Sequence, residues 1–300
     1  MSEIDPVKIE KENEKDLLIL TEIEEKVMKN INLGFDVQVL ETLEREDVTR
    51  KDIEALKEVI SKDIVVRLFG VGNSIYYGRL RAGKFSNFSE IILRLGTEPA
   101  KVYILSLSLF FMKHDEAFLS LAARSFIISL LGKMLAKQMG MKEEDVKKVE
   151  LGGLFLKVGK VFMLLYEQQR GEPLEREFVS KYYRYLGSKM VERFKLPEFL
   201  LEVLSSPVCN FTENSFDIRG VVQLAHSIVD KNFKNFGKFV IQSPMPDKEG
   251  LVTSSLGSII ENQLDAIGLG AYLEIIPSLS LQQQIHQARK SNVASRSAAP

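Results

Sequence analysis

The spacing of apolar residues most constrains the fold, because it is helical along almost the whole chain. In the middle of the chain the spacing follows i, i+3, i+4 and i+7, and the run stops before Gly140: Leu119, Ala123, Phe126, Ile127, Leu130 and Met134. No convincing two-residue alternation, typical of a strand, occurs before residue 236. Thr49 followed by Asp52 is a capping-box pattern, and Pro197 suits the first turn of a helix over residues 198–204. The sequence therefore predicts an all-α multi-helix bundle.

Composition narrows the class of protein. With 45% apolar residues, 27% charged residues and a net charge of −1, the chain is expected to be soluble and to have no general affinity for nucleic acid. The single cysteine, Cys209, excludes an internal disulfide and fits a reducing compartment. No apolar run is expected to reach the length of a membrane span, and no secretion signal is visible. We therefore expect a cytoplasmic protein without a membrane segment.

Four segments follow from the changes in pattern along the chain. Residues 1–30 are acidic and then amphipathic, which predicts one helix at the edge of the fold. Residues 31–236 form the predicted main helical domain. Residues 237–281, with several prolines and glycines and a second apolar helix around residues 256–264, are interpreted as a C-terminal extension packed on the bundle. Residues 282–300 are polar and small, which predicts a disordered tail.

Three short patterns in the main segment resemble a known family. Asn73-Ser74 is followed by Leu95-Gly96, and further along stands Leu151-Gly-Gly-Leu-Phe-Leu-Lys-Val-Gly-Lys160. This last frame resembles the Gly-Leu-Leu-His-Asp-Ile-Gly-Lys segment of HD-superfamily metal-dependent phosphohydrolases. In order and spacing, the three patterns resemble the HDOD domain, the HD-related output domain of bacterial signalling proteins. The chain departs from that family at Ile64, where a proline is common, and it has no tryptophan.

The two positions that would bind the metal are occupied by Leu156 and Lys157. A divalent cation needs imidazole nitrogens or carboxylate oxygens, and an ammonium group repels it. The resemblance therefore implies a non-catalytic HD-type bundle with no metal and no cofactor, which acts by binding a protein partner. It also implies an association with two-component or cyclic-dinucleotide pathways, so a cyclic nucleotide stays open as a ligand.

The residues around Asn73 are a candidate binding site. We expect a helix to end at Gly70 to Gly72, with Asn73 or Ser74 satisfying the free backbone groups. In the functional alternative, Asn73 and Ser74 rim a groove for a partner or anion together with two tyrosines, Tyr76 and Tyr77. Residues 67–94 carry five basic side chains against one acidic, Glu90, which gives a net charge of +4: Arg67, Arg79, Arg81, Lys84 and Arg94. Such a cluster suits an acidic protein surface or phosphate groups, although a solvated face is the more common interpretation.

The dipeptide His114-Asp115 is a weaker metal candidate. It lies in a polar turn between two predicted helices, no histidine precedes it, and only His226 and His286 follow. We expect Asp115 to begin a helix and His226 to be a partly buried helical residue with a hydrogen-bond partner. Cys209 has no basic neighbour in sequence that would lower its pKa, so a catalytic thiol is not expected.

Two rival functions stay open beside the non-catalytic signalling module. A divergent phosphohydrolase could hold a metal with carboxylates from several parts of the chain, such as Asp63, Asp115, Glu150 and Asp217. A nucleotide-sensing receptor could use the basic residues between Arg67 and Arg94. Metal analysis tests the first rival, and ligand-induced thermal stabilisation tests the second.

Overall fold

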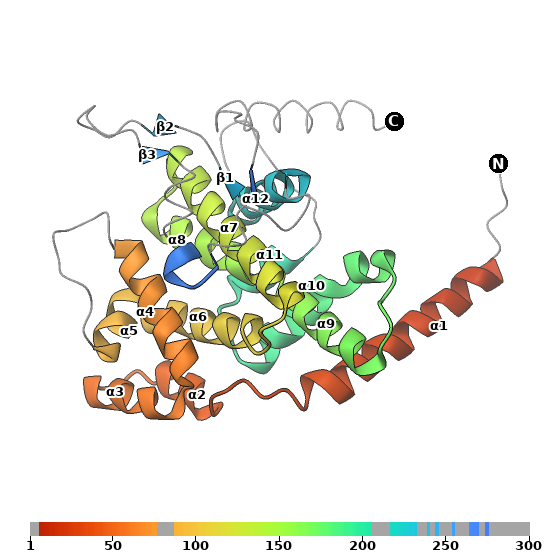
Figure 1. Ribbon diagram of the computed structural model, residues 1–300, viewed down its shortest axis with the longest axis horizontal. Coiled ribbons are helices and arrows are strands. Elements are labelled where there is room, and N and C mark those ends of the chain that lie inside the picture. The colour runs from red at the N-terminus through yellow and green to blue at the C-terminus, as the bar shows by residue number, and fades with distance from the viewer. Residues whose placement is uncertain are drawn as a thin grey trace.

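The computed structural model describes residues 6–76, 87–205, 217–232, 239–240, 244–245, 254–255, 264–269 and 274–275. For residues 6–13, 74–76 and 231–232, and for the short strands, only the backbone course is described. Helices pack around one continuous apolar core (Figure 1). The predicted all-α class is confirmed. The described part of the chain also contains four strands of two residues each, all near the C-terminus.

A helix at the edge of the molecule opens the chain. α1 (Pro6–Glu22) continues into a π-helical segment, η1 (Ile23–Met28), and lies beside α9 and α10 (Figure 1). Ile23 and Val27 are buried, and Asp16 accepts a hydrogen bond of 2.9 Å from Tyr182 of α10. The amphipathic helix predicted within residues 1–30 is therefore present, with its apolar side toward the bundle.

Four helices form one end of the bundle: α2 (Gln38–Glu44), α3 (Arg50–Val59), α4 (Lys62–Tyr76) and α5 (Phe88–Leu95) (Figure 1). The predicted capping box begins α3. The Thr49 hydroxyl accepts from the backbone N–H of Asp52 at 3.2 Å, and the Asp52 carboxylate accepts from the backbone N–H of Thr49 at 2.9 Å. This reciprocal pair satisfies two donors that the first helical turn leaves free.

The predicted helix end at Gly70 to Gly72 is wrong, because α4 continues through both glycines and through Asn73 to Tyr76. A Cβ atom on Gly70 would lie 2.1 Å from the backbone oxygen of Ala266, and one on Gly72 would lie 2.9 Å from the Ile91 side chain. The two glycines allow close packing rather than a change of backbone direction. From the sequence alone, glycines that allow close packing cannot be distinguished from glycines that end a helix.

Three long helices form the centre: α6 (Thr97–Phe110), α7 (Glu116–Gln138) and α8 (Glu143–Phe155). The helix predicted to end before Gly140 is α7. Contrary to the expectation from the sequence, α7 is long and apolar enough to cross a membrane, with a mean hydropathy of 1.5 in its most apolar window. However, 78% of that window is buried inside the protein. The other helices supply the apolar surroundings that α7 requires, as for a core helix.

The second end of the bundle consists of α9 (Gly159–Arg170), α10 (Arg176–Arg193), α11 (Phe199–Leu204) and α12 (Ile218–Asn232). Beyond it, β1 (Phe239–Val240) pairs in parallel with β4 (Glu274–Ile275), and β2 (Pro244–Met245) pairs antiparallel with β3 (Ser254–Ser255). Residues 264–269 pack on α4, where the Arg67 guanidinium donates to the backbone oxygen of Ile267. The predicted domain limits themselves, including the tail over residues 282–300, stay a prediction.

Candidate functional site

The turn between α8 and α9 carries the frame that the sequence singles out. Leu156, Lys157 and Val158 leave α8, and α9 begins at Gly159. A Cβ atom on Gly159 would lie 1.7 Å from the backbone oxygen of Tyr183, so α9 and α10 are in backbone contact at this point. Only glycine fits there. The turn is thereby held in the interior, where the side chains of Leu156 and Lys157 are at most 2% exposed.

Lys157 is paired with a carboxylate from a distant part of the chain. Its Nζ atom donates to Oδ1 of Asp230 on α12 at 2.8 Å. The other carboxylate oxygen, Oδ2, lies 2.9 Å from Nε2 of His226, one helical turn earlier on α12. A buried ammonium group is tolerated in a protein only when it is paired or hydrogen-bonded. Asp230 provides that pairing.

Burial controls the protonation of this cluster. Burial, together with the positive charge of Lys160, lowers the pKa of Lys157 to about 8, although Asp230 acts in the opposite direction. Burial also lowers the pKa of His226, so the imidazole is neutral at neutral pH. Burial alone would raise the pKa of Asp230, but the close approach of His226 and the charge of Lys157 hold this pKa far below its usual value. Asp230 is therefore a carboxylate throughout the physiological range.

The surroundings of the pair are cationic. Arg124 of α7 lowers the pKa of Lys157 and of Lys160 through its charge. The Lys160 ammonium group lies 4.8 Å from the centre of the Tyr183 ring. Arg184 donates from Nε to the Tyr183 hydroxyl at 2.9 Å and from a terminal nitrogen to Gln223 at 2.8 Å. A divalent cation would therefore meet repulsion from several side chains.

These residues do not fit a metal ion. A metal site needs several nitrogen, oxygen or sulfur donors that converge, and the described part of the chain contains no group of three or more His, Cys, Asp or Glu arranged to hold one. At the frame itself, Leu156 has no donor atom and Lys157 carries a positive charge. Of the cluster around Lys157, only His226 and Asp230 have suitable donors, and the carboxylate is already neutralised.

The four carboxylates of the phosphohydrolase alternative do not come together as a metal site. Asp63 pairs with Arg67 at 2.9 Å. Asp115 caps α7 by accepting from the backbone N–H of Phe118 at 3.1 Å. Asp217 accepts from the backbone N–H of Gly220 at 2.5 Å, before α12. Each of these three acids makes its contact within, or at the start of, its own helix.

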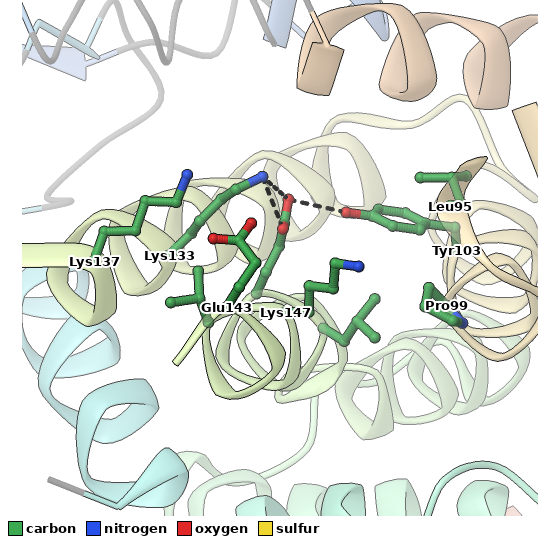
Figure 2. A pocket seen from close by; sticks show the side chains of 10 residues that line it. Leu95, Pro99, Tyr103, Lys133, Lys137, Glu143 and Lys147 are labelled. Carbon is green, nitrogen blue, oxygen red and sulfur yellow. Dashed lines mark hydrogen bonds and ion pairs between the residues drawn. The ribbon is translucent and has the colours of Figure 1, made fainter. Parts of the chain in front are cut away.

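Glu150, the fourth of these carboxylates, lines a cavity of about 70 Å³ between α6, α7 and α8. The side chains of Lys133 and Tyr103, labelled in Figure 2, both contact the Glu150 carboxylate. The Lys133 ammonium group lies 2.8 Å from it, and the Tyr103 hydroxyl donates at 3.2 Å. Lys133 balances the charge of this buried acid. Glu150 therefore connects three core helices and is not available as a metal ligand.

Only part of the candidate anion site around Asn73 falls within the described residues, so the site stays a prediction. Arg67 is occupied, since it pairs with Asp63, donates to the backbone of Ile267 and lies with its guanidinium 3.7 Å from the centre of the Phe111 ring. Arg94 pairs with Glu90 on α5 at 3.3 Å. Asn73 lies within α4 and is partly buried. Ser74 and Tyr76 are described only by their backbone, and the remaining candidates lie outside the described residues: Tyr77, Arg79, Arg81 and Lys84.

The structure also places the remaining candidate residues, the dipeptide His114-Asp115 and His226. His114-Asp115 lies in the turn between α6 and α7, with Asp115 as the cap of α7, as expected. His226 is a partly buried helical residue, as expected, but the hydrogen bond expected for it is not formed at Nε2, which lies 2.9 Å from Asp230 without hydrogen-bond geometry. Cys209 and His286 lie outside the described residues.

The sequence reasoning missed Asp230 as the partner of the degenerate frame. A separation of 73 residues gives no spacing signal for the contact between Lys157 and Asp230. One signal was available: His226 and Asp230 are four residues apart, and residues at that spacing share one face of a helix. A histidine and an aspartate on one face of a helix indicate a polar contact on that face.

Comparisons with known proteins identify the family of this chain. The HDOD domain matches residues 35–206. The chain is similar to a candidate metal-dependent phosphohydrolase from Shewanella amazonensis SB2B, with a TM-score of 0.57 and 16% identity over 93% of this chain and 98% of the other. It is also similar to an HDOD domain protein with unknown function from Geobacter sulfurreducens, with a TM-score of 0.47 and 16% identity over 92% and 95% of the two chains. No curated protein gives a significant match. Because the domain match covers more than half of its residues, the chain belongs to the HDOD family.

Proposed function

We propose that this HDOD protein is a non-catalytic regulatory module of bacterial signal transduction that acts by binding a protein partner. One observation carries the non-catalytic part of the proposal. Lys157 fills the place of a metal-binding residue with a buried positive charge, 2.8 Å from a carboxylate on another helix. Leu156 beside it has no donor atom. A hydrolase of the HD type would need the opposite chemistry at both positions.

The dispersed carboxylates support the same conclusion. Asp63, Asp115 and Asp217 stabilise the first turns or the neighbourhood of their own helices, and Glu150 is neutralised in the core. Moving any of them to a shared metal would break an existing contact. Among the described members of the basic cluster, Arg67 gives the nucleotide-receptor alternative no comparable support, because it is committed to contacts within the protein.

Metal analysis and a turnover assay test the non-catalytic part. The full chain is purified without chelator, incubated with Mn²⁺, Fe²⁺ or Zn²⁺, desalted and measured for bound metal and for hydrolysis of bis(p-nitrophenyl) phosphate. We expect no stoichiometric metal and no turnover above the buffer. A stoichiometric transition metal together with turnover that is lost on chelation would contradict the proposal.

An open groove of about 630 Å³ over α10 and α11 offers a surface for the partner. Its lining combines apolar floor residues with tyrosines, serines and two cations, and contains no carboxylate: Ser180, Lys181, Tyr183, Arg184, Tyr185, Ser188, Leu201, Leu204 and Ser205. Tyrosine and arginine are enriched where proteins meet. Both cations have partners within the protein, since Lys181 lies 3.2 Å from Asp16 and Arg184 donates to Gln223 at 2.8 Å, so the lining does not fix the charge of the partner segment.

Affinity capture from the native cell tests the partner-binding part. We expect Lys181→Glu to reduce recovery of the partner, because it reverses a charge in the groove lining. Lys62→Glu is the matched control, since Lys62 is an exposed lysine at the start of α4. Equal recovery with both variants would place the interaction elsewhere, and a native chain that co-purifies with no stoichiometric protein would contradict partner binding.

A further inference from the structure

Acidic side chains of α1 meet tyrosines and a lysine of the helices beside it. Asp16 accepts a hydrogen bond of 2.9 Å from the Tyr182 hydroxyl and lies 3.2 Å from the Lys181 ammonium group, both on α10. Glu22, the last residue of α1, accepts from the Tyr166 hydroxyl of α9. We call the surface formed by these two tyrosines and the lysine the tyrosine face; α1 lies along it (Figure 1).

The apolar part of the contact made by α1 is short. Of the side chains described in this helix, Ile19 and Leu20 are buried, whereas Leu17 and Leu18 are 61% and 64% exposed. A helix held by two aliphatic side chains and a few hydrogen bonds near the surface belongs to the elements that open most easily.

The segment that follows α1 is anchored in the core. Ile23, Val27 and Met28 of η1 are at most 4% exposed, and Arg193 of α10 donates to the backbone oxygen of Met28. Between Glu22 and Ile23 the backbone changes from an α-helix to the rare π-helical form. Such a junction can act as a hinge, so α1 can leave the tyrosine face while η1 stays in the core.

The same carboxylate contacts reach the groove proposed for the partner. Lys181, the neighbour of Asp16, lines that groove, and so does Tyr185, whose hydroxyl donates to Glu24 of η1 at 2.8 Å. An acidic segment of the chain itself therefore already contacts two residues of the groove. When α1 leaves, Lys181 and Tyr182 lose the carboxylate of Asp16, and a segment that replaces α1 gains most by supplying another.

We infer that α1 is a detachable cover over the tyrosine face, and that an acidic amphipathic helix of the partner takes its place. The replacing helix supplies the carboxylates and the short apolar strip that α1 supplies now. Partner and α1 then compete, and the apparent affinity for the partner falls in proportion to the fraction of molecules in which the face is open. The inference rests on the proposed function, because a displaceable helix regulates only a chain that binds a partner.

A labelled peptide with the sequence of residues 6–22 tests whether the tyrosine face accepts an acidic helix. Fluorescence anisotropy compares the full native chain with a variant that carries Asp16→Lys and Glu22→Lys, which weaken the contacts of its own α1. We expect the peptide to bind this variant at least about tenfold more tightly than the native chain, because the face is open in more molecules. The matched control carries Glu14→Lys and Glu25→Lys, the same change of charge at exposed positions, and should behave like the native chain.

Hydrogen exchange of the native chain is a second measurement, and it needs no variant. The backbone amides of α1 should exchange at least about tenfold faster than those of η1, because α1 opens locally at the junction. Equal exchange rates in α1 and η1 would overturn the inference, since the two segments would then open only together.

Two further outcomes would also overturn the inference. One is equal affinity of the peptide, or no binding, for the native chain, the variant and the control. The other is a native dimer that Asp16→Lys and Glu22→Lys dissociate in light scattering, because a second copy of this chain would then occupy the face. None of these measurements uses the native partner, so the proposed function stands or fails separately, by affinity capture.

Discussion

The two partners of the buried pair should respond very differently to mutation. Asp230 keeps part of its hydration and its contact with His226, whereas Lys157 has lost almost all contact with water. Asp230→Asn leaves an ammonium group in the interior without an anion, and breaking a buried pair in this way costs roughly 3–5 kcal/mol. Lys157→Met keeps the length of the side chain and leaves a carboxylate that water can reach. We expect its stability to lie within about 1 kcal/mol of the native chain or above it.

The native chain and Lys157→Met should also differ in how their free energy of unfolding depends on pH, because the pKa of Lys157 is lowered in the folded state. A lysine whose pKa falls from 10.5 to about 8 is disfavoured as a cation in the folded state by about 3 kcal/mol. Between these two values the unfolded chain binds more protons than the folded chain, so the free energy of unfolding rises with pH. The groups that face Lys157 are Lys160, Arg124 and Asp230, and His226 is already neutral in this range. From pH 7 to about pH 9.5 the native chain should therefore gain about 2 kcal/mol relative to Lys157→Met.

Urea unfolding followed by circular dichroism measures both effects. The native chain, Lys157→Met and Asp230→Asn are compared at pH 7, and the first two again at about pH 9.5. A midpoint for Asp230→Asn equal to or above that of Lys157→Met at pH 7 would refute the asymmetry. A constant difference between the native chain and Lys157→Met at both pH values would refute the assignment of a lowered pKa to this lysine.

Three further changes test contacts elsewhere in the fold. Gly159→Ala should lower stability by more than about 3 kcal/mol or prevent folding, because α9 and α10 would have to separate; a thermal midpoint within a few degrees of native would contradict the backbone contact. Thr49→Ala should cost about 1 kcal/mol in urea unfolding through loss of the helix cap, with no change expected if α3 begins elsewhere. Arg67→Ala should expose the segment around Ile267 to limited proteolysis, whereas Arg94→Ala, which removes a surface pair with Glu90 and no contact to that segment that the structure describes, should leave the cleavage rate unchanged.

The helical architecture could be predicted because each signal for it is local. Apolar spacing identifies α7, and two residues three positions apart identify the start of α3. Gly70 and Gly72 show the limit of such signals, because a glycine can mark either a helix end or a close approach between helices. Only the position of Ala266, far along the chain, decides between these possibilities.

The candidate site was predictable to a smaller extent. The frame shows that the two adjacent metal ligands are missing, because neither Leu156 nor Lys157 can bind a metal ion. The frame does not identify the partner of Lys157, because Asp230 comes close to the frame only through the packing of α12. The contacts of Arg67, one member of the alternative anion site, could not be predicted for a related reason. A positive charge in sequence says nothing about the carbonyl and the ring that occupy it in space.

The contact between Lys157 and Asp230 joins residues that are 73 positions apart in the chain. Before α12 has docked, the ammonium group lies in water and carries no cost of burial. The pair therefore forms only in the completed core, and a partly assembled bundle gains nothing from it.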